Sequence, residues 1–162
     1  EICACLVGSE MCKETAAEVA EDLRSNAEKH GITITVDTKT AVINGNRNQI
    51  YELIYNLCDN AIRYNRENGS VKIITGDDNE HPFVKVADTG IGIAPEEQGK
   101  VFERFYRVDK SRSKARGGTG LGLAIVKHAA LYHHATLDLS SELGVGTTIT
   151  VTFPIQQDEP FA

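Results

Sequence analysis

The chain has 162 residues, of which 41% are hydrophobic and 25% are charged, and its formal net charge is −6 at pH 7. This length and composition are typical of one globular domain with a buried core. The acidic balance argues against general nucleic-acid binding, no run approaches the roughly 18 apolar residues of a membrane-spanning helix, and no signal peptide opens the chain.

The spacing of apolar residues predicts alternating helices and strands in chain order. Helices are predicted over residues 11–29, 47–65 and 121–134. Strands are predicted over residues 32–38, 40–45, 70–78, 81–90, 136–142 and 147–154. Residues 94–118 are rich in charge and predict a loop with one or two short helical turns. Helices mixed with hairpin-linked strands indicate an α/β sandwich with the helices on one face of the sheet.

The four cysteines, Cys3, Cys5, Cys12 and Cys58, form no CxxC pair. Three of them lie in the first dozen residues, without partners for a zinc site. We therefore predict reduced thiols, as in a cytosolic protein. Because the chain begins at Glu1 without an initiator methionine, we expect it to be a piece of a longer protein.

The predicted helix over 47–65 carries an unusual polar set beside its apolar side. The apolar side consists of Ile50, Leu53, Ile54, Leu57 and Ala61. Asn56, Asn60, Arg63 and Tyr64 lie about a quarter-turn away, at the margin of the buried face. Amide oxygens suit Mg²⁺, a cation suits phosphate, and a tyrosine ring can stack on a base. A helix whose polar side merely holds two asparagines stays open as an alternative.

Three glycine-containing stretches lie further along the chain. "DTGIGI" (88–93) ends a predicted strand, and its Asp88 could accept hydrogen bonds from an amino group. "GGTGLGL" (117–123) leads into a helix, where free N–H groups attract phosphate. Gly144 and Gly146, with Thr147, lie between the last two strands, where an ordinary hairpin is equally plausible.

A basic stretch separates the first two glycine motifs. Five cations, Arg107, Lys110, Arg112, Lys114 and Arg116, lie in this loop of an acidic protein. A solvated loop explains such charges, but a lid that closes on a polyphosphate explains them better beside a phosphate-binding glycine motif. The aromatic residues Phe102, Phe105 and Tyr106 are expected to pin one end of this lid against the body.

Taken together, these motifs resemble the catalytic, ATP-binding domain of sensor histidine kinases. NxxxN at Asn56 and Asn60, DxGxG at 88–92, FERFYR at 102–107 and GxGxG at 118–122 resemble its asparagine, first glycine, phenylalanine and second glycine boxes, in that order. The likeness covers residues 11–154 and is strongest to the phosphate-response and cell-wall-regulating branch of membrane-anchored kinases. It implies the Bergerat (GHKL) fold, a two-layer α/β sandwich with a mixed sheet of about five strands covered by three helices. We expect this domain over 11–155, after an N-terminal remnant or linker (1–10) and before a C-terminal tail (156–162).

The resemblance implies ATP and Mg²⁺ as cofactors and assigns roles at the phosphate end. Asn60 would ligate Mg²⁺, and Asn56 would line the metal and phosphate side. Arg63 would touch phosphate, and Arg107 would reach the γ-phosphate. Arg107, Asn56 and Arg63 are thus the implied catalytic residues.

At the base end, the resemblance implies that Tyr64 packs on the adenine. Asp88 would accept a hydrogen bond from the adenine amino group, with a water held at Thr147. The other implied nucleotide contacts are Gly90, Gly92, Ile93, Tyr106, Gly118, Thr119, Gly120, Leu121 and Gly122.

The implied activity is transfer of the ATP γ-phosphoryl group to a histidine on a separate dimerisation hairpin of the same protein. A response regulator would be the next partner, and nucleic acid is not expected as one. The domain itself would be soluble and cytoplasmic, in a dimeric parent protein anchored in the bacterial inner membrane. None of the five histidines fits the acceptor motif of an acidic residue followed by proline, so we expect surface or packing roles for them and no activity of the fragment alone.

Related ATPases of the same fold carry a glutamate four residues before the metal-binding asparagine, which activates water. Here that position is Asn56, which cannot act as a base, so hydrolysis should be slow. Two other functions stay open: a serine kinase of the anti-sigma type, and a nucleotide-sensing domain without catalysis. The FERFYR stretch argues against the first, and the chemically intact boxes argue against the second.

Overall fold

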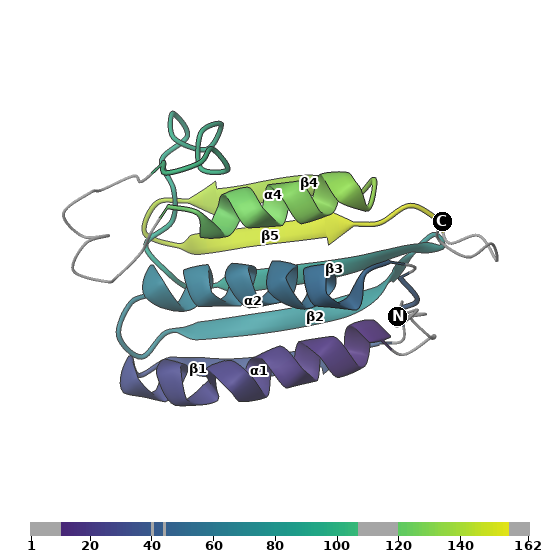
Figure 1. Cartoon of the computed structure of the whole chain (residues 1–162). Coiled ribbons are helices and arrows are strands. Elements are labelled where there is room, and N and C mark those ends of the chain that lie inside the picture. Colours follow the sequence, from purple (N-terminus) through teal and green to yellow (C-terminus); the bar gives the residue numbers. More distant parts are fainter. Residues whose placement is uncertain (1–10, 40, 44, 107–119, 156–162) are drawn as a thin grey trace.

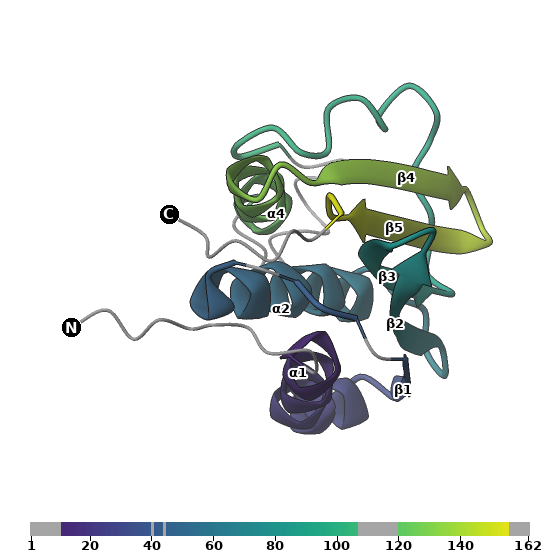
Figure 2. The same cartoon turned by 90° about the vertical axis from the view of Figure 1, so that its right-hand side faces the viewer.

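The structure of the protein is a computed structural model that describes residues 11–39, 41–43, 45–106 and 120–155, with side chains from Lys13 onward. In this part of the chain, one five-stranded sheet carries three helices on one face, so the molecule has two layers (Figures 1 and 2). The helices are α1 (Met11–Lys29), α2 (Arg47–Arg63) and α4 (Gly122–Tyr132). The predicted helices and the two-layer mixed architecture are confirmed.

The strands of the sheet stand in the order β1-β2-β3-β5-β4. Only the pair β1 and β2 is parallel; the other neighbouring pairs are antiparallel. The bounds are β1 (Thr33–Thr38), β2 (Ser70–Asp78), β3 (His81–Asp88), β4 (Thr136–Glu142) and β5 (Gly146–Thr152). At the left-hand edge of Figure 1, α2 and β3 end, α4 begins, and β4 turns into β5.

The core lies between the helices and the sheet, with α2 at its centre. The buried residues of α2 are Ile50, Leu53, Ile54, Leu57, Cys58, Ala61 and Ile62. Alternate residues of the central strands meet them, namely Val71, Ile73, Val84, Val86, Ile149 and Val151. The apolar side predicted for this helix is therefore buried. Cys58 is a buried free thiol, and the side chains of the other three cysteines lie outside the described residues.

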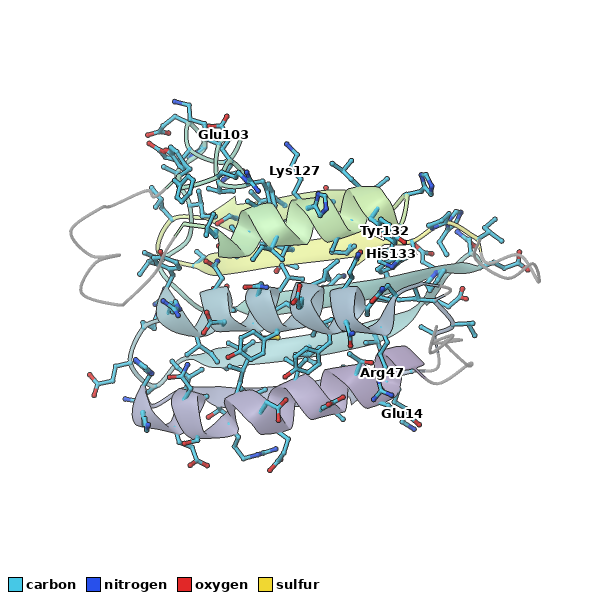
Figure 3. The ribbon with its side chains drawn as sticks, in the orientation of Figure 1. Glu14, Arg47, Glu103, Lys127, Tyr132 and His133 are labelled. Atoms are coloured by element: carbon cyan, nitrogen blue, oxygen red, sulfur yellow. The ribbon has the colours of Figure 1, made fainter. Side chains whose placement is uncertain are left out.

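The end of α4 meets the start of α2 through a buried histidine, His133 (Figure 3). The backbone N–H of Asn46, the N-cap of α2, donates to His133 Nε2 at 3.1 Å, so the ring proton lies on Nδ1 and is donated to the Ala129 carbonyl at 2.7 Å. Burial lowers the pKa of this imidazole, which keeps it neutral. His133 thus has the packing role expected of it.

One predicted strand, over 40–45, is wrong. Ala41 and Ile43 are buried and Val42 is exposed, which is the alternation of a strand, but residues 41–43 pair with no strand of the sheet. The last ladder-like contact is the Lys39 N–H donating to the Thr75 carbonyl at 3.0 Å, just beyond the end of β1. The alternation arises because this connection packs against the core, and not from a hydrogen-bonded ladder.

The pair Ile43 and Val42 tests whether this connection is part of the core. Ile43→Ala should lower the free energy of unfolding by about 2–5 kcal/mol, because the side chain is completely buried. Val42→Ala, at a neighbouring side chain that is 38% exposed, should cost less than about 1 kcal/mol. Urea denaturation of both variants measures the difference. Equal losses would show that the connection does not pack as described.

Candidate functional site

The polar set of α2 lies where the sequence predicts it. Asn56, Asn60, Arg63 and Tyr64 are all half-buried, beside the fully buried side of the helix. The Asn56 Nδ2 donates to the Glu52 carbonyl at 2.7 Å, so the amide bonds back to its own helix and its oxygen points away from this contact. Arg63 Nε forms an ion pair with Asp59 at 2.8 Å, one turn earlier.

Asp88, the last residue of β3, lies beside Thr147 of β5 because the two residues are partners in the antiparallel ladder. Asp88 Oδ1 accepts hydrogen bonds from the N–H of Gly90 at 2.8 Å and the N–H of Thr147 at 3.2 Å. Burial raises the pKa of this carboxyl to about 6, while the two hydrogen bonds act in the opposite direction. The structure thus brings together Asp88 and Thr147, which are 59 positions apart in the chain.

The glycines of the 88–93 stretch are required by the protein's own backbone. A Cβ on Gly90 would lie 2.4 Å from the carbonyl oxygen of Tyr64, at the end of α2. Gly92 has a φ of +74°, and a Cβ there would lie 2.1 Å from the carbonyl oxygen of Glu142. The Ile91 N–H donates to the Tyr64 carbonyl at 3.0 Å, which fixes this stretch to the end of α2. Contact of these glycines with a ligand stays a prediction.

The start of α4 lies next to the asparagines of α2. A Cβ on Gly122 would lie 3.4 Å from Asn56 Oδ1, so the first turn of α4 faces that amide oxygen. Leu121, the N-cap, makes no side-chain capping hydrogen bond, and the first turn has no acidic residue. The first turn of α4 therefore brings the partial positive charge of a helix N-terminus beside Asn56.

The aromatic residues before the basic stretch behave in two ways. Phe102 and Tyr106 pack against the core, as predicted. Phe105 differs from the prediction, since its side chain is 69% exposed. Its backbone makes the contact instead: the Phe105 N–H donates to the Gly120 carbonyl at 2.9 Å, and Gly120 has a φ of +77°. Arg107, Gly118, Thr119 and the predicted lid lie outside the described residues.

A set of polar residues that sequence reasoning missed supports this region. Ser141 Oγ lies 2.7 Å from Thr147 Oγ1 and accepts from the Ile93 N–H at 2.8 Å. Gln98 Nε2 donates to the carbonyls of Ile93 and Ser141, at 2.9 and 3.1 Å. The sequence carries no signal for either residue, because Ser141 and Gln98 are ordinary residues in polar stretches and their partners are distant in the chain.

Two further findings concern metal binding and membrane crossing. The described residues contain no group of three or more His, Cys, Asp or Glu side chains placed to hold a metal ion. Within the same part of the chain, no helix has the length and apolar character needed to cross a membrane.

Comparison with known proteins identifies the class to which this fold and site belong. Residues 45–157 match the family model described as histidine kinase-, DNA gyrase B-, and HSP90-like ATPase. The chain therefore belongs to this ATP-binding family, and within it the chain is a catalytic domain of the sensor histidine kinase type.

Individual relatives support this placement. The chain is 44% identical over 133 residues to the sensor-like histidine kinase SenX3 of Mycolicibacterium smegmatis, covering 82% of this chain and 35% of SenX3. It is 38% identical over 138 residues to the phosphate regulon sensor protein PhoR of Pseudomonas aeruginosa, covering 85% of this chain and 31% of PhoR. The chain thus spans about a third of the length of these relatives.

Among solved structures, full-length ShkA in complex with AMPPNP has a TM-score of 0.78 and 27% identity, covering 88% of this chain and 30% of ShkA.

The raised pKa of Asp88 predicts a pH dependence of stability. In the folded state this carboxyl keeps its proton up to about pH 6, against about pH 4 in the unfolded chain. Between these values the folded state binds more protons, so wild-type stability falls as the pH rises through the window. Asp88→Asn removes this dependence. The free energy of unfolding of the variant, taken relative to that of the wild type, should therefore rise by up to about 3 kcal/mol between pH 4 and pH 7. Urea denaturation at both pH values measures this difference, and a pH-independent difference would contradict the prediction.

Proposed function

We propose that this domain binds ATP with Mg²⁺ and transfers the γ-phosphoryl group to a histidine on a separate helical hairpin of its parent protein. The observation that carries the proposal is the half-buried Asp88 carboxylate, fixed by two backbone N–H groups beside a helix that presents two asparagines. The AMPPNP bound by the structural neighbour ShkA supports an adenine nucleotide as the ligand.

At the base end, Asp88 accepts a hydrogen bond from the adenine amino group. Its Oδ1 is already occupied by backbone donors, so Oδ2 is the oxygen left for the ligand. Tyr64 packs on the adenine, and Thr147 holds a water beside it. Ile93, Tyr106, Gly90 and Gly92 complete the contacts around the base. A neutral carboxyl would accept more weakly, so the ionised form of Asp88 is the binding form.

At the phosphate end, the residues of α2 and the start of α4 fit a magnesium-bound polyphosphate. Amide oxygens are hard, neutral ligands, and Mg²⁺ commonly takes one or two protein ligands beside substrate phosphates. Asn60 is the metal ligand, and Asn56 lines the metal and phosphate side, facing the first turn of α4. When bound, Mg²⁺ neutralises charge on the phosphates. Arg63 and Arg107 add positive charge, and the backbone of Gly118, Thr119, Gly120, Leu121 and Gly122 contacts the phosphates.

The domain contributes positioning and charge neutralisation to phosphoryl transfer, and at the position where related ATPases carry a base for water it has an amide. The position of the water-activating glutamate in related ATPases is Asn56, whose amide N–H is engaged by the Glu52 carbonyl. An imidazole nitrogen of the acceptor histidine forms the new N–P bond as the bond from the γ-phosphorus to the bridging oxygen breaks, and ADP leaves. The domain therefore holds ATP until an acceptor is supplied.

The parent protein follows the pattern of the relatives. PhoR and SenX3 are named as a sensor protein and a sensor-like histidine kinase, and both are about three times the length of the matched region. We infer a dimeric parent anchored in the bacterial inner membrane, with this domain (11–155) in the cytoplasm between a linker (1–10) and a tail (156–162). A response regulator takes the phosphoryl group from the acceptor histidine.

Phosphotransfer to a supplied hairpin tests the function. The purified domain, radiolabelled ATP, Mg²⁺ and a histidine-bearing hairpin from a related kinase should give a labelled hairpin whose label is lost in acid. Asp88→Asn should reduce nucleotide affinity about 10- to 100-fold in calorimetry, because a charge-assisted hydrogen bond is lost. His30→Ala, at an exposed residue in the turn after α1, should change nothing.

The chemistry of the label separates this function from its rivals. An acid-stable label would indicate a serine kinase. Saturable binding without any transfer would indicate a nucleotide sensor. No heat at millimolar nucleotide with demonstrably folded protein would overturn the proposal as a whole.

The metal role of Asn60 is tested by the magnesium dependence of binding. Asn60→Ala should lower the affinity for ATP about 10-fold in Mg²⁺ and much less in EDTA, since one metal ligand is lost but the contacts with the base remain. Asn48→Ala, an exposed asparagine in the first turn of the same helix, is the matched control and should leave both affinities unchanged. Equal weakening of Asn60→Ala in Mg²⁺ and in EDTA would contradict metal ligation.

A further inference from the structure

Arg66, two residues beyond the C-cap of α2, connects two loops that flank Asp88. Its Nη2 donates to the carbonyl oxygen of Gly90 at 3.0 Å, in the stretch after β3. The same nitrogen donates to the carbonyl oxygen of Gly144, in the turn between β4 and β5. Both donors of Asp88 are close to these contacts: Gly90 is itself one donor, and Thr147, the second residue of β5 and three residues after Gly144, is the other.

We propose that Arg66 is a positioning residue that clamps the carbonyls of Gly90 and Gly144 and thereby holds both backbone donors of Asp88 in place. The effect of this clamp on nucleotide binding rests on the function proposed above. Its effect on the hydrogen bonds of Asp88 in the empty protein does not. The motifs singled out in the sequence do not include Arg66.

The turn that carries Arg66 is built to hold its backbone still. The Arg66 N–H donates to Asn65 Oδ1 at 2.9 Å, and the Gly69 N–H donates to the Arg66 carbonyl at 3.0 Å. The buried Asn65 amide also donates to the Ser70 carbonyl at 2.9 Å. A Cβ on Gly69 would lie 2.1 Å from Asn65 Oδ1, so the turn requires glycine there. The turn therefore fixes the backbone of Arg66, and the contact with the two loops requires ordering of its side chain alone.

The two loops also contact each other directly at the same place. The Gly144 N–H donates to the Ile91 carbonyl at 2.9 Å. The guanidinium adds charge-assisted hydrogen bonds, and one of its nitrogens, Nη2, serves both acceptors. A lysine at the same position would keep the charge on a side chain that is one atom shorter, so its ammonium would not reach both carbonyls. This difference lets the clamp be separated from a simple electrostatic effect of the positive charge.

The clamp acts on the pKa of Asp88 through the two hydrogen bonds that this carboxyl accepts. Burial raises the pKa of this carboxyl, and the hydrogen bonds from Gly90 and Thr147 lower it. Two charged side chains on the neighbouring elements form ion pairs: Arg63 of α2 pairs with Asp59, and Lys72 of β2 pairs with Asp37. Looser loops would weaken both hydrogen bonds, and the pKa of Asp88 would then move further upward.

Direct titration of the Asp88 carboxyl by carbon-detected NMR, on the empty domain, tests the clamp without nucleotide. The midpoint should lie near pH 6 in the wild type and move to higher pH in Arg66→Ala. Arg66→Lys should also move it upward, because the charge is kept and the two-carbonyl contact is lost. Arg24→Ala, an exposed arginine of α1 paired only within its own helix among the described residues, is the matched control and should leave the midpoint unchanged.

Each outcome decides the question. An unchanged midpoint in folded Arg66→Ala would overturn the proposal. A shift in Arg66→Ala with none in Arg66→Lys would overturn it too, since charge alone would then explain the effect. If Arg66→Ala does not fold, Arg66→Lys alone is read in the same way: an upward shift supports the clamp and an unchanged midpoint overturns it.

Nucleotide affinity gives a second readout that rests on the proposed function. At pH 7, Arg66→Ala should weaken ADP binding about tenfold, consistent with the loss of hydrogen bonds to a charged group. In an Asp88→Asn background the same substitution should have little further effect, because its action passes through Asp88. Full additivity would overturn the proposed route. Absence of ADP binding by the wild type would instead refute the proposed function and leave the carboxyl titration as the test of the clamp.

Discussion

This end of the molecule is organised around the hydrogen bonds that hold the half-buried Asp88 carboxylate, at the end of β3, to the N–H groups of Gly90 and Thr147. A buried carboxylate is costly unless hydrogen bonds compensate it, so the backbone around it has to be placed accurately. Two positions show this constraint. A Cβ on Gly90 would lie 2.8 Å from Asp88 Oδ1, and a Cβ on Gly146 would lie 2.0 Å from the Asp88 carbonyl oxygen. The glycines of the motifs thus serve the protein's own packing around an acceptor that is kept partly desolvated.

The helix α2 shows how the same element contributes to the core and to the site. Its buried side fills the centre of the two-layer sandwich, while Asn56 and Asn60 lie at the margin of that side. Asparagine is a mediocre helix former because its amide competes for backbone groups. Here Asn56 satisfies its N–H on the Glu52 carbonyl, which leaves the amide oxygen toward the start of α4. The helix therefore tolerates a residue that a purely structural helix would not need.

Much of the architecture could be predicted from the sequence because it follows local periodicity. The three helices and the strand pairs joined by short turns were predictable, and so was the buried side of α2. The prediction of a strand over 40–45 was wrong, because both strands and irregular segments packed on a core show burial that alternates with exposure. The exposed Phe105 was missed for a related reason, since its contact with Gly120 is made by backbone atoms and leaves no trace in residue type.

The candidate site likewise contains residues that the sequence marks and residues that it does not. Motif residues such as Asn60 and Asp88 could be singled out from the sequence because their proposed chemistry is specific to their residue types. Arg66 and Ser141, which support the region around Asp88, contact backbone groups of segments dozens of positions away. Backbone carbonyls and N–H groups are present at every position, so no residue pattern marks where such contacts form. On the proposed role of Arg66, substitutions outside the four motifs change the acceptor strength of Asp88 without altering a residue that the nucleotide is proposed to touch. An intact set of motifs is then an incomplete guide to the strength of nucleotide binding.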